Sequence, residues 1–346
     1  MALDEWRFER SRQTEPQSVN NILRRDDSNI DSQPRVSVLM PVFNTVRYLQ
    51  DALESIGNQT FADFELLVVD DGSIDGSTKI LESFAARDRR VRLVTRENFG
   101  LIATRNELLG AARGEFIAWM DSDDISLPDR LASELHCFAN DPTLVCVGSA
   151  AQCIDPEGNF LNIEHYPPAH ADILVDQQKG GAMRFPTTMM RRDAALRVGG
   201  FREPFKIGED FDLLLRLSEV GRMANLPEIL YYYRQHLSSV CVGLGPSWPI
   251  YRDHILDLAR ERRANGRDRL QNGGTLPIAT QITTDKRLVE SQVYVSWARY
   301  ALHNDNVPLA WRYACSAVAR SPASMSAWKM VVRAAMRNAS RRSAEK

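Results

Sequence analysis

Short apolar runs alternate with amphipathic stretches over the first two thirds of the sequence. The runs have the length of buried strands and cover residues 36–40, 64–69, 91–94, 116–120 and 144–148. Helical patterns lie between them, and the clearest one places apolar residues on one face at positions 46, 49, 52, 53 and 56. Strands that alternate with helices at this spacing predict an α/β fold with a doubly wound, mostly parallel sheet.

Polar or small residues follow four of these strands, at 41–44, 70–73, 98–100 and 121–123. The carboxyl ends of parallel strands lie along one edge of such a sheet, where ligands bind. The fourth strand stops at Asp121, Asp123 and Asp124, and hard oxygen ligands of this kind suit Mg²⁺ or Mn²⁺ carrying a phosphorylated substrate. A turn or a helix cap is the alternative explanation for the carboxylates. A new helix is expected next, with Ser126 as its cap and Pro128 in its first turn.

Length, composition and charge are those of an ordinary globular protein: 346 residues, 44% hydrophobic, 25% charged, with a formal net charge of −2. This charge gives no reason to expect nucleic acid as a partner. Five cysteines without metal-binding spacing favour packing roles in a reducing compartment. Because the chain has neither a membrane-spanning apolar run nor the apolar core of a secretory signal, we expect it to be cytoplasmic or on the cytosolic face of a membrane.

The composition divides the chain into three parts. Residues 1–34 are polar and lack periodicity, so a mobile extension is expected there. Residues 35–240 hold the predicted α/β domain. In residues 241–346, a Gly- and Pro-containing linker at 243–249 precedes helical patterns near 250–264, 286–303, 307–320 and 323–337. These helices are too few for a free solenoid, so we expect them to pack on the domain before them.

The end of the chain is basic, with Lys329, Arg333, Arg337, Arg341 and Arg342. A solvated helix face is the default explanation. Attraction to an anionic membrane, at about 1 kcal/mol per basic residue near the surface, is the more specific alternative.

Several motifs together resemble the family-2 glycosyltransferases, which have the GT-A fold and use nucleotide-activated sugars. They are the segments 41–44 (Pro-Val-Phe-Asn), 68–73 (Val-Val-Asp-Asp-Gly-Ser), 98–106 (Asn-Phe-Gly-Leu-Ile-Ala-Thr-Arg-Asn) and 120–124 (Met-Asp-Ser-Asp-Asp). The resemblance continues through 199–201 (Gly-Gly-Phe), 208–210 (Gly-Glu-Asp) and 233–236 (Tyr-Arg-Gln-His). It implies that residues 35–240 form a GT-A catalytic domain.

The resemblance implies nucleotide binding by residues of the strand ends: Pro41, Phe43, Asn44, Asp71, Asn98, Gly100, Arg105 and Asp121. Phe43 would lie against the base, with loop packing as the alternative. Asp71 would accept a hydrogen bond from uracil N3–H. Arg105 would bridge to Asp71 or to the nucleotide, or else form a surface ion pair. Asn98 and Gly100 would shape the pocket wall.

By the same resemblance, Asp121 and Asp123 form the family's D-x-D motif. Asp123 would ligate Mn²⁺ or Mg²⁺, and Asp121 would contact ribose, the metal or water bound to it. His236 follows a predicted antiparallel strand at 231–234 and is a further candidate ligand, with a structural role as the alternative. For Asp124 we favour capping of the following helix.

The acidic pair Glu209–Asp210 begins a predicted helix, where the macrodipole alone favours carboxylates. In the family, the Asp of this pair is the general base, and Glu209 would orient the acceptor or cap the helix. One base with no candidate nucleophile opposite suits a single displacement with inversion.

These inferences predict a metal-dependent, inverting, non-processive glycosyltransferase. Its donor would be a nucleotide-sugar, with UDP-sugars favoured, and its acceptor a glycan or lipid-linked sugar in surface polysaccharide or glycolipid assembly. A nucleotidyltransferase of similar topology is one alternative, but the segment 42–45 lacks the Gly-rich, Lys-containing loop it would need. A scaffold that binds nucleotide-sugar without catalysis is the other.

Overall fold

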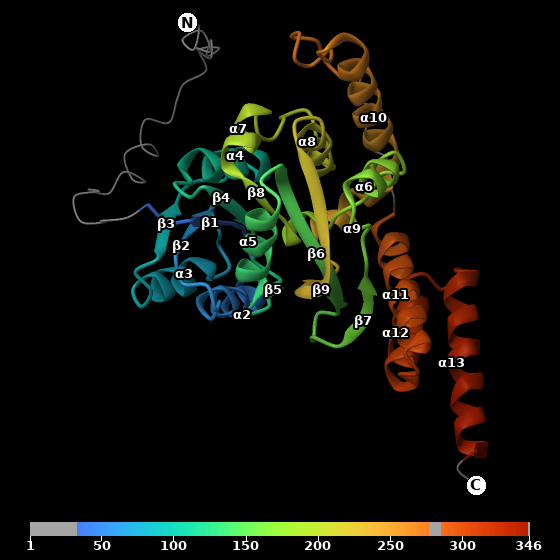
Figure 1. The fold of residues 1–346 in the computed structure, drawn as a ribbon. Coiled ribbons are helices and arrows are strands. Elements are labelled where there is room, and N and C mark those ends of the chain that lie inside the picture. Colours follow the sequence, from blue (N-terminus) through green and yellow to red (C-terminus); the bar gives the residue numbers. More distant parts are fainter. Residues whose placement is uncertain (1–32, 277–284, 345–346) are drawn as a thin grey trace, which may run out of the picture.

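The computed structural model describes residues 33–276 and 285–344, so nearly all of the extension expected at 1–34 lies outside the described residues. A curled sheet carries helices on its faces, and α11–α13 lie to one side (Figure 1). The strands are β1 (Val36–Val42), β2 (Phe64–Asp70), β3 (Val91–Thr95), β4 (Phe116–Trp119), β5 (Ile125–Ser126), β6 (Leu144–Ile154), β7 (Phe160–Glu164), β8 (Met189–Arg191) and β9 (Arg222–Arg234).

The α-helices of the described residues follow the predicted pattern closely in the first half of the chain. They are α2 (Val46–Gly57), α3 (Ser77–Ala85), α4 (Leu101–Ala111), α5 (Arg130–Asn140), α6 (His170–Gln177), α7 (Arg192–Arg197), α8 (Glu209–Ser218), α9 (Val240–Leu244), α10 (Trp248–Asn265), α11 (Lys286–His303), α12 (Val307–Arg320) and α13 (Met325–Ala344). None of these described helices is both long and apolar enough to cross a membrane.

The sheet has the strand order β3-β2-β1-β4-β8-β6-β9-β5, with β7 paired to β6. Its first four strands are parallel, which confirms the prediction and brings their carboxyl ends to one edge. β8 is antiparallel to both β4 and β6. The segment 231–234, predicted as an antiparallel strand, is the end of β9, which runs parallel to β6 and antiparallel only to the short β5.

Two apolar cores lie on the opposite faces of the sheet. Val38 and Met40 of β1 contribute to a core that includes residues of α2, α3 and α5. Leu39 contributes to the other core, with residues of α4, α7 and α8. This division follows from the strand geometry, because successive side chains point to opposite faces. Both faces of the central strands are therefore covered, as in other parallel sheets.

Two local predictions are wrong, for reasons of tertiary pairing. Ser126 does not cap a helix: it belongs to β5, opposite Tyr231 of β9, and α5 begins only at Arg130. Pro128 consequently precedes that helix. The predicted linker at 243–249 is largely helical, because α10 begins at Trp248 and uses the proline that follows it in its first turn.

The helices α11–α13 pack on one another and on the β6–β7 part of the sheet. Their shared core includes Leu161 of β7 and Trp297 of α11. The indole N–H of Trp297 donates to Oε1 of Gln235 at 2.8 Å, and the Asn304 amide donates to the carbonyl of Leu161 at 2.6 Å. A separate core joins α10 to α8. Apolar burial and polar contacts thus both attach these helices to the residues before them.

A buried ion pair on α5 contacts the sheet near the acidic loop that follows β4. Arg130 and Glu134 of α5 are completely buried, 3.2 Å apart. The guanidinium also donates to the carbonyls of Trp119 on β4 and Thr188 before β8, at 2.9 and 3.3 Å. Burial raises the pKa of the Glu134 carboxyl from its ordinary 4.5 to about 7, although Arg130 lowers it in part.

We expect Glu134 to make stability depend on pH. Because its pKa is raised in the folded state, its contribution to stability is fully present below about pH 4.5 and is lost as the pH rises through about 7. The difference in unfolding free energy between wild type and Glu134→Gln should fall by an amount on the order of 3 kcal/mol over this range. Urea denaturation at several pH values measures it. The exposed Glu82→Gln is the control, and parallel curves for wild type and Glu134→Gln would contradict the assignment.

Candidate functional site

The loops after β1, β2 and β4 are tied together by short polar side chains. The side-chain oxygen of Asn44 accepts a hydrogen bond from the backbone N–H of Ile74, and the backbone N–H of Asn44 donates to the Ser73 hydroxyl, both at 2.9 Å. Its φ of 53° lies in the left-handed region, which asparagine tolerates better than most residues. The Thr45 hydroxyl donates to that of Ser122 at 3.0 Å, which connects the first loop to the acidic loop. Asn44 therefore holds neighbouring loops in position.

Asp71 organises the loop after β3. Its buried carboxylate accepts the backbone N–H groups of Phe99 and Gly100, each at 2.9 Å, and pairs with Arg96. Gly100 has a φ of 90° and stands at the start of α4, a conformation that favours glycine. Of the two bridges predicted for Arg105, the one to Asp71 is wrong, because Arg96, which comes immediately after β3, holds that position. The bridge to the nucleotide stays a prediction.

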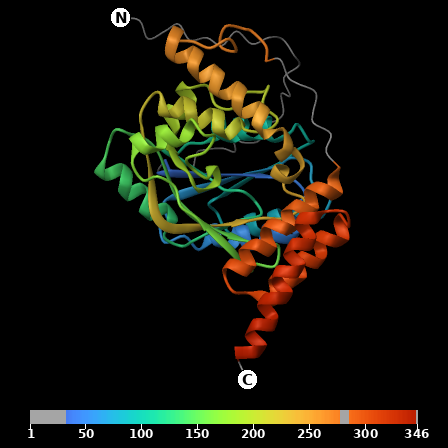
Figure 2. The same ribbon diagram turned by 90° about the vertical axis from the view of Figure 1, so that its right-hand side faces the viewer.

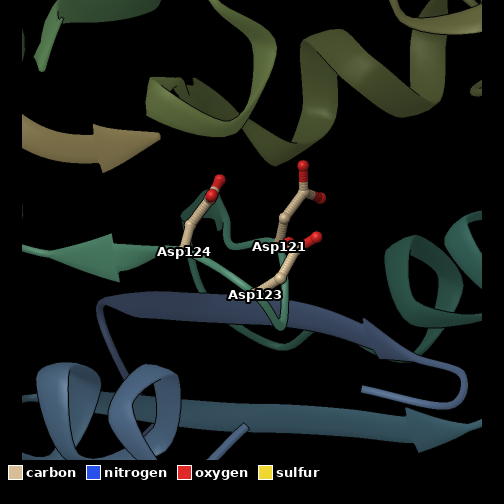
Figure 3. A group of neighbouring side chains, drawn as sticks. All are labelled: Asp121, Asp123 and Asp124. Carbon is tan, nitrogen blue, oxygen red and sulfur yellow. The ribbon is translucent and has the colours of Figure 1, made fainter. Parts of the chain in front are cut away.

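The three carboxylates after β4 gather on one loop (Figure 3). One oxygen from each of Asp121, Asp123 and Asp124 can be chosen so that all three lie within 4.8 Å of one another. Nε2 of His236 lies 2.7 Å from Oδ2 of Asp123, and its Nδ1 lies 2.7 Å from the Ser238 hydroxyl. The structure thus brings His236, 113 residues away in sequence, to the acidic loop.

Asp124 ties this loop to β9. The prediction that it caps α5 is therefore wrong. Its Oδ1 accepts the backbone N–H of Arg234 at 2.7 Å, while the Arg234 side chain donates to the carbonyl of Asp123 at 2.8 Å. The Asp121 amide donates to the Tyr231 hydroxyl at 3.2 Å. Oδ2 of Asp124 is buried and makes no hydrogen bond. An acidic cluster with such an unsatisfied oxygen fits a divalent cation, since carboxylates are ligands that Mg²⁺ and Mn²⁺ prefer.

Arg105 connects this acidic loop to the acidic pair of α8. Its guanidinium donates to Oε1 of Glu209 at 2.5 Å and lies 3.7 Å from Oδ1 of Asp121. The Arg105 side chain is 7% exposed, so it is not the surface ion pair considered as an alternative. Aromatic rings surround the guanidinium, at 5.0–6.0 Å from their centroids: Trp119, Phe185 and Phe201.

The crowded carboxylates have altered affinities for protons. Burial raises the pKa of Asp121 to about 6 and that of Glu209 to about 7; in both cases Arg105 opposes the shift and Asp210 adds to it. Burial, together with the other two carboxylates of the loop, raises the pKa of Asp124 well above its usual range. Such perturbed groups gather at functional sites.

The remaining candidate residues border this region. Pro41 lies within β1, whereas Phe43 and Asn98 are exposed on the loops after β1 and β3. Phe99 is also exposed, with the Arg96 guanidinium 4.7 Å from its ring centroid. The structure thus offers two exposed aromatic rings, one on each loop.

Comparisons with known proteins point to one family of enzymes. A sequence model described as Glycosyl transferase family 2 matches residues 37–199. The O-antigen biosynthesis glycosyltransferase WbnJ of Escherichia coli is 34% identical over 209 residues, which are 59% of this chain and 81% of that protein. The chain belongs to glycosyl transferase family 2. Membership confirms the predicted class of enzyme, a glycosyltransferase, and removes the nucleotidyltransferase alternative.

Longer relatives contain a region similar to this glycosyltransferase. The hyaluronan synthase of Pasteurella multocida is 30% identical over 221 residues, which are 64% of this chain and 22% of that protein. A crystal structure of Staphylococcus aureus TarS residues 1–349 in complex with UDP-GlcNAc superposes with a TM-score of 0.52 at 18% identity, covering 90% of this chain and 92% of that one. The GT-A fold is thereby confirmed.

Sequence reasoning missed three residues of the site of this glycosyltransferase: Arg96, Tyr231 and Arg234. Arg96 had a detectable signal, because it follows β3 at the same edge of the sheet where Asp71 follows β2. Tyr231 and Arg234 act on the acidic loop through contacts that span more than a hundred residues. Arg234 lies in the 233–236 motif, but its local sequence did not indicate this contact.

We expect Arg105→Met to destabilise this glycosyltransferase by about 3–5 kcal/mol, because Glu209 would lose its partner in a buried site. Arg47→Met is the matched control: its ion pair with Glu157 is exposed, so it should cost less than about 1 kcal/mol. Urea denaturation of both variants provides the comparison. Equal, small losses would mean that Arg105 does not stabilise this arrangement.

Proposed function

We propose that the protein transfers a sugar from a UDP-sugar to a hydroxyl group of a glycan or lipid-linked acceptor, with inversion and with a divalent cation, Mn²⁺ or Mg²⁺. The observation that carries the proposal is the Arg105 bridge, which joins the acidic pair of α8 to the acidic loop after β4. On this proposal, the carboxylates of the donor side and those of the acceptor side would be parts of one connected site.

Asp123 and Asp121 would hold the cation, with His236 beside them. The support is the donor set itself: carboxylate oxygens within 4.8 Å of one another and an imidazole nitrogen at 2.7 Å from Asp123. A cation bound there would neutralise the negative charge that develops on the departing nucleoside diphosphate. Whether or not it binds the cation, His236 orients the Asp123 carboxylate, because the other ring nitrogen of His236 is fixed by the Ser238 hydroxyl.

Asp210 is the better candidate for the general base. Glu209 is buried and its carboxylate is paired with Arg105, whereas Asp210 is only partly buried. Asp210 takes the proton of the acceptor hydroxyl as the oxygen forms its bond to the anomeric carbon. The bond from that carbon to the phosphate oxygen breaks, and UDP leaves. Glu209 positions Arg105, which in turn faces Asp121.

Asp71 would receive the base of the nucleotide. Its three hydrogen-bond donors already fix the carboxylate, so any contact to uracil N3–H would use remaining acceptor capacity on a preoriented group. Phe43 and Phe99 supply exposed rings near these loops on which a base could stack.

The relatives suggest a role in polysaccharide assembly. WbnJ is named for O-antigen biosynthesis, and the hyaluronan synthase for a glycan product. This chain spans 22% of the length of that synthase and of the Pasteurella multocida chondroitin synthase. The acceptor and pathway proposed here are therefore inferred only from the region that this chain shares with those synthases. A screen of UDP-, GDP- and dTDP-sugars for thermal stabilisation in the presence of Mn²⁺ tests the donor class.

Nucleotide binding should depend on metal through Asp123. Mn²⁺ should strengthen UDP binding to the wild type in calorimetric titrations, and Asp123→Ala should lose that gain. Asp71→Ala is the matched control, because loss of a contact to the base weakens UDP and free uridine alike, with or without Mn²⁺. A metal effect that survives in Asp123→Ala would contradict the ligand assignment. If Asp71→Ala weakened only UDP, Asp71 would belong to the metal site.

Asp210→Asn should separate binding from chemistry. The amide keeps the shape of the side chain but cannot take the acceptor's proton, so the transfer rate should fall about 10²–10⁴-fold while UDP affinity changes little. Glu209→Gln should have a milder effect on the rate. Transfer assays beside UDP titrations for both variants measure this. Near wild-type transfer by Asp210→Asn would exclude it as the base, and no transfer by the wild type with any donor would favour the non-catalytic scaffold.

A further inference from the structure

The last helix, α13, presents an apolar face that no described residue covers. Its packing face consists of Ala327, Met330 and Ala334, which are buried in the core shared with α11 and α12. A second set of apolar side chains is spaced by three, four and four residues and therefore lies on one side of the helix. These side chains are 51–73% exposed: Met325, Trp328, Val332 and Met336. We call them the apolar stripe.

Basic side chains border the apolar stripe on one flank. Lys329 and Arg333 each follow a stripe residue by one position, so they lie beside the stripe on the helical surface. No ion-pair partner lies near either of them among the described residues. Arg337 extends this flank, although it pairs with Asp305 at 3.2 Å.

The charge of the whole segment is one-sided. From residue 306 to residue 344 the sequence contains no Asp or Glu and seven Lys or Arg, in a chain whose net charge is −2. Arg341 and Arg342, part of the basic tail noted in the sequence, belong to this segment, but their side chains lie outside the described residues. Arg312 and Arg320 of α12 are paired with acidic residues of other elements. The basic charge that borders the apolar stripe is therefore that of Lys329 and Arg333.

This combination indicates which partner covers the stripe. A second copy of the chain, packed stripe to stripe with its helix antiparallel, would bring Lys329 and Arg333 toward their own counterparts, and like charges would oppose the contact. An anionic bilayer instead offers an apolar interior for the stripe and negative headgroups for the basic flank. The indole N–H of Trp328 donates to the carbonyl of Pro322 at 2.8 Å, and this bond keeps the ring on the outer surface of the helix. Amphipathic rings of this kind are common at membrane interfaces.

We propose that α13 binds the surface of an anionic lipid bilayer, with the apolar stripe inserted among the headgroups and Lys329 and Arg333 contacting their phosphates. The helix reaches beyond the rest of the molecule in two perpendicular views, so a bilayer can approach it (Figures 1 and 2). This contact is peripheral and is independent of the transfer chemistry proposed above.

Cosedimentation with lipid vesicles tests the proposal. The full chain should bind vesicles that contain phosphatidylglycerol and bind phosphatidylcholine vesicles much more weakly, with binding reduced by salt. Lys329→Gln combined with Arg333→Gln should weaken binding about thirtyfold, which corresponds to about 1 kcal/mol for each basic residue. The matched control, Arg89→Gln with Arg197→Gln, removes two exposed charges elsewhere and should bind as the wild type does.

The apolar stripe has its own variant and control. Trp328→Ser with Val332→Ser should weaken binding on the order of tenfold or more, whereas Val175→Ser, an exposed apolar position on α6, should not. Because these side chains are exposed, circular dichroism and UDP affinity should be unchanged. Trp328→Phe should still bind, but brominated phosphatidylglycerol should quench less tryptophan fluorescence than in the wild type.

Either of two results would overturn the proposal. One is equal binding to anionic vesicles by the wild type and the Trp328→Ser, Val332→Ser variant. The other is a wild type that does not bind vesicles but self-associates in sedimentation equilibrium, with the association lost in the same variant; the apolar stripe would then be an interface between copies of the chain.

Discussion

The buried guanidinium of Arg105 connects the three elements that build the site. It lies on α4, pairs with Glu209 at the start of α8 and faces Asp121 after β4. A cation in an apolar setting is costly unless it is paired, and here two carboxylates and three aromatic rings compensate for its lost hydration. Because Glu209 and Asp121 both face the guanidinium of Arg105, the position of either carboxylate constrains the other. The distance between the acidic loop and the acidic pair of α8 is therefore set by one side chain.

The acidic loop is organised at an electrostatic cost. Three carboxylates held close together repel one another, and the raised pKa values of Asp121 and Asp124 express that repulsion and their burial. Contacts from β9 keep the arrangement in place, through the backbone N–H and guanidinium of Arg234. The loop thus stays in a conformation that a divalent cation would stabilise, so little reorganisation would accompany binding.

Local periodicity was sufficient to predict β1–β4 and β6, the helices between them and the edge where four strand ends meet, but not β5, β7 and β8, which complete the sheet by long-range pairing. It also led to the acidic pair at the start of α8, because a helix start has a local signature. It could not predict the partner of Arg105, which lies 104 residues away, or the pairing of Ser126 with Tyr231 that replaces a helix cap. Asp124 was misassigned for the same reason. Its partner on β9 is specified by the fold of the intervening chain, whereas its neighbours in sequence suggested only metal binding or helix capping.

The attachment of the last helices to β9 relates the site to the exposed face of α13. Consecutive residues serve the two regions: His236 contacts Asp123, and Gln235 accepts the indole N–H of Trp297 on α11. Asp155, after β6, is likewise buried against Tyr313 of α12. Since α13 packs on these two helices, its exposed face keeps a defined orientation relative to the acidic loop. A flexible tether would hold the enzyme near a surface but leave the site free to turn in any direction. With α13 bound to a bilayer as proposed, a packed attachment would instead present the site at a fixed angle and height, which would suit a hydroxyl group carried by a molecule anchored in that surface.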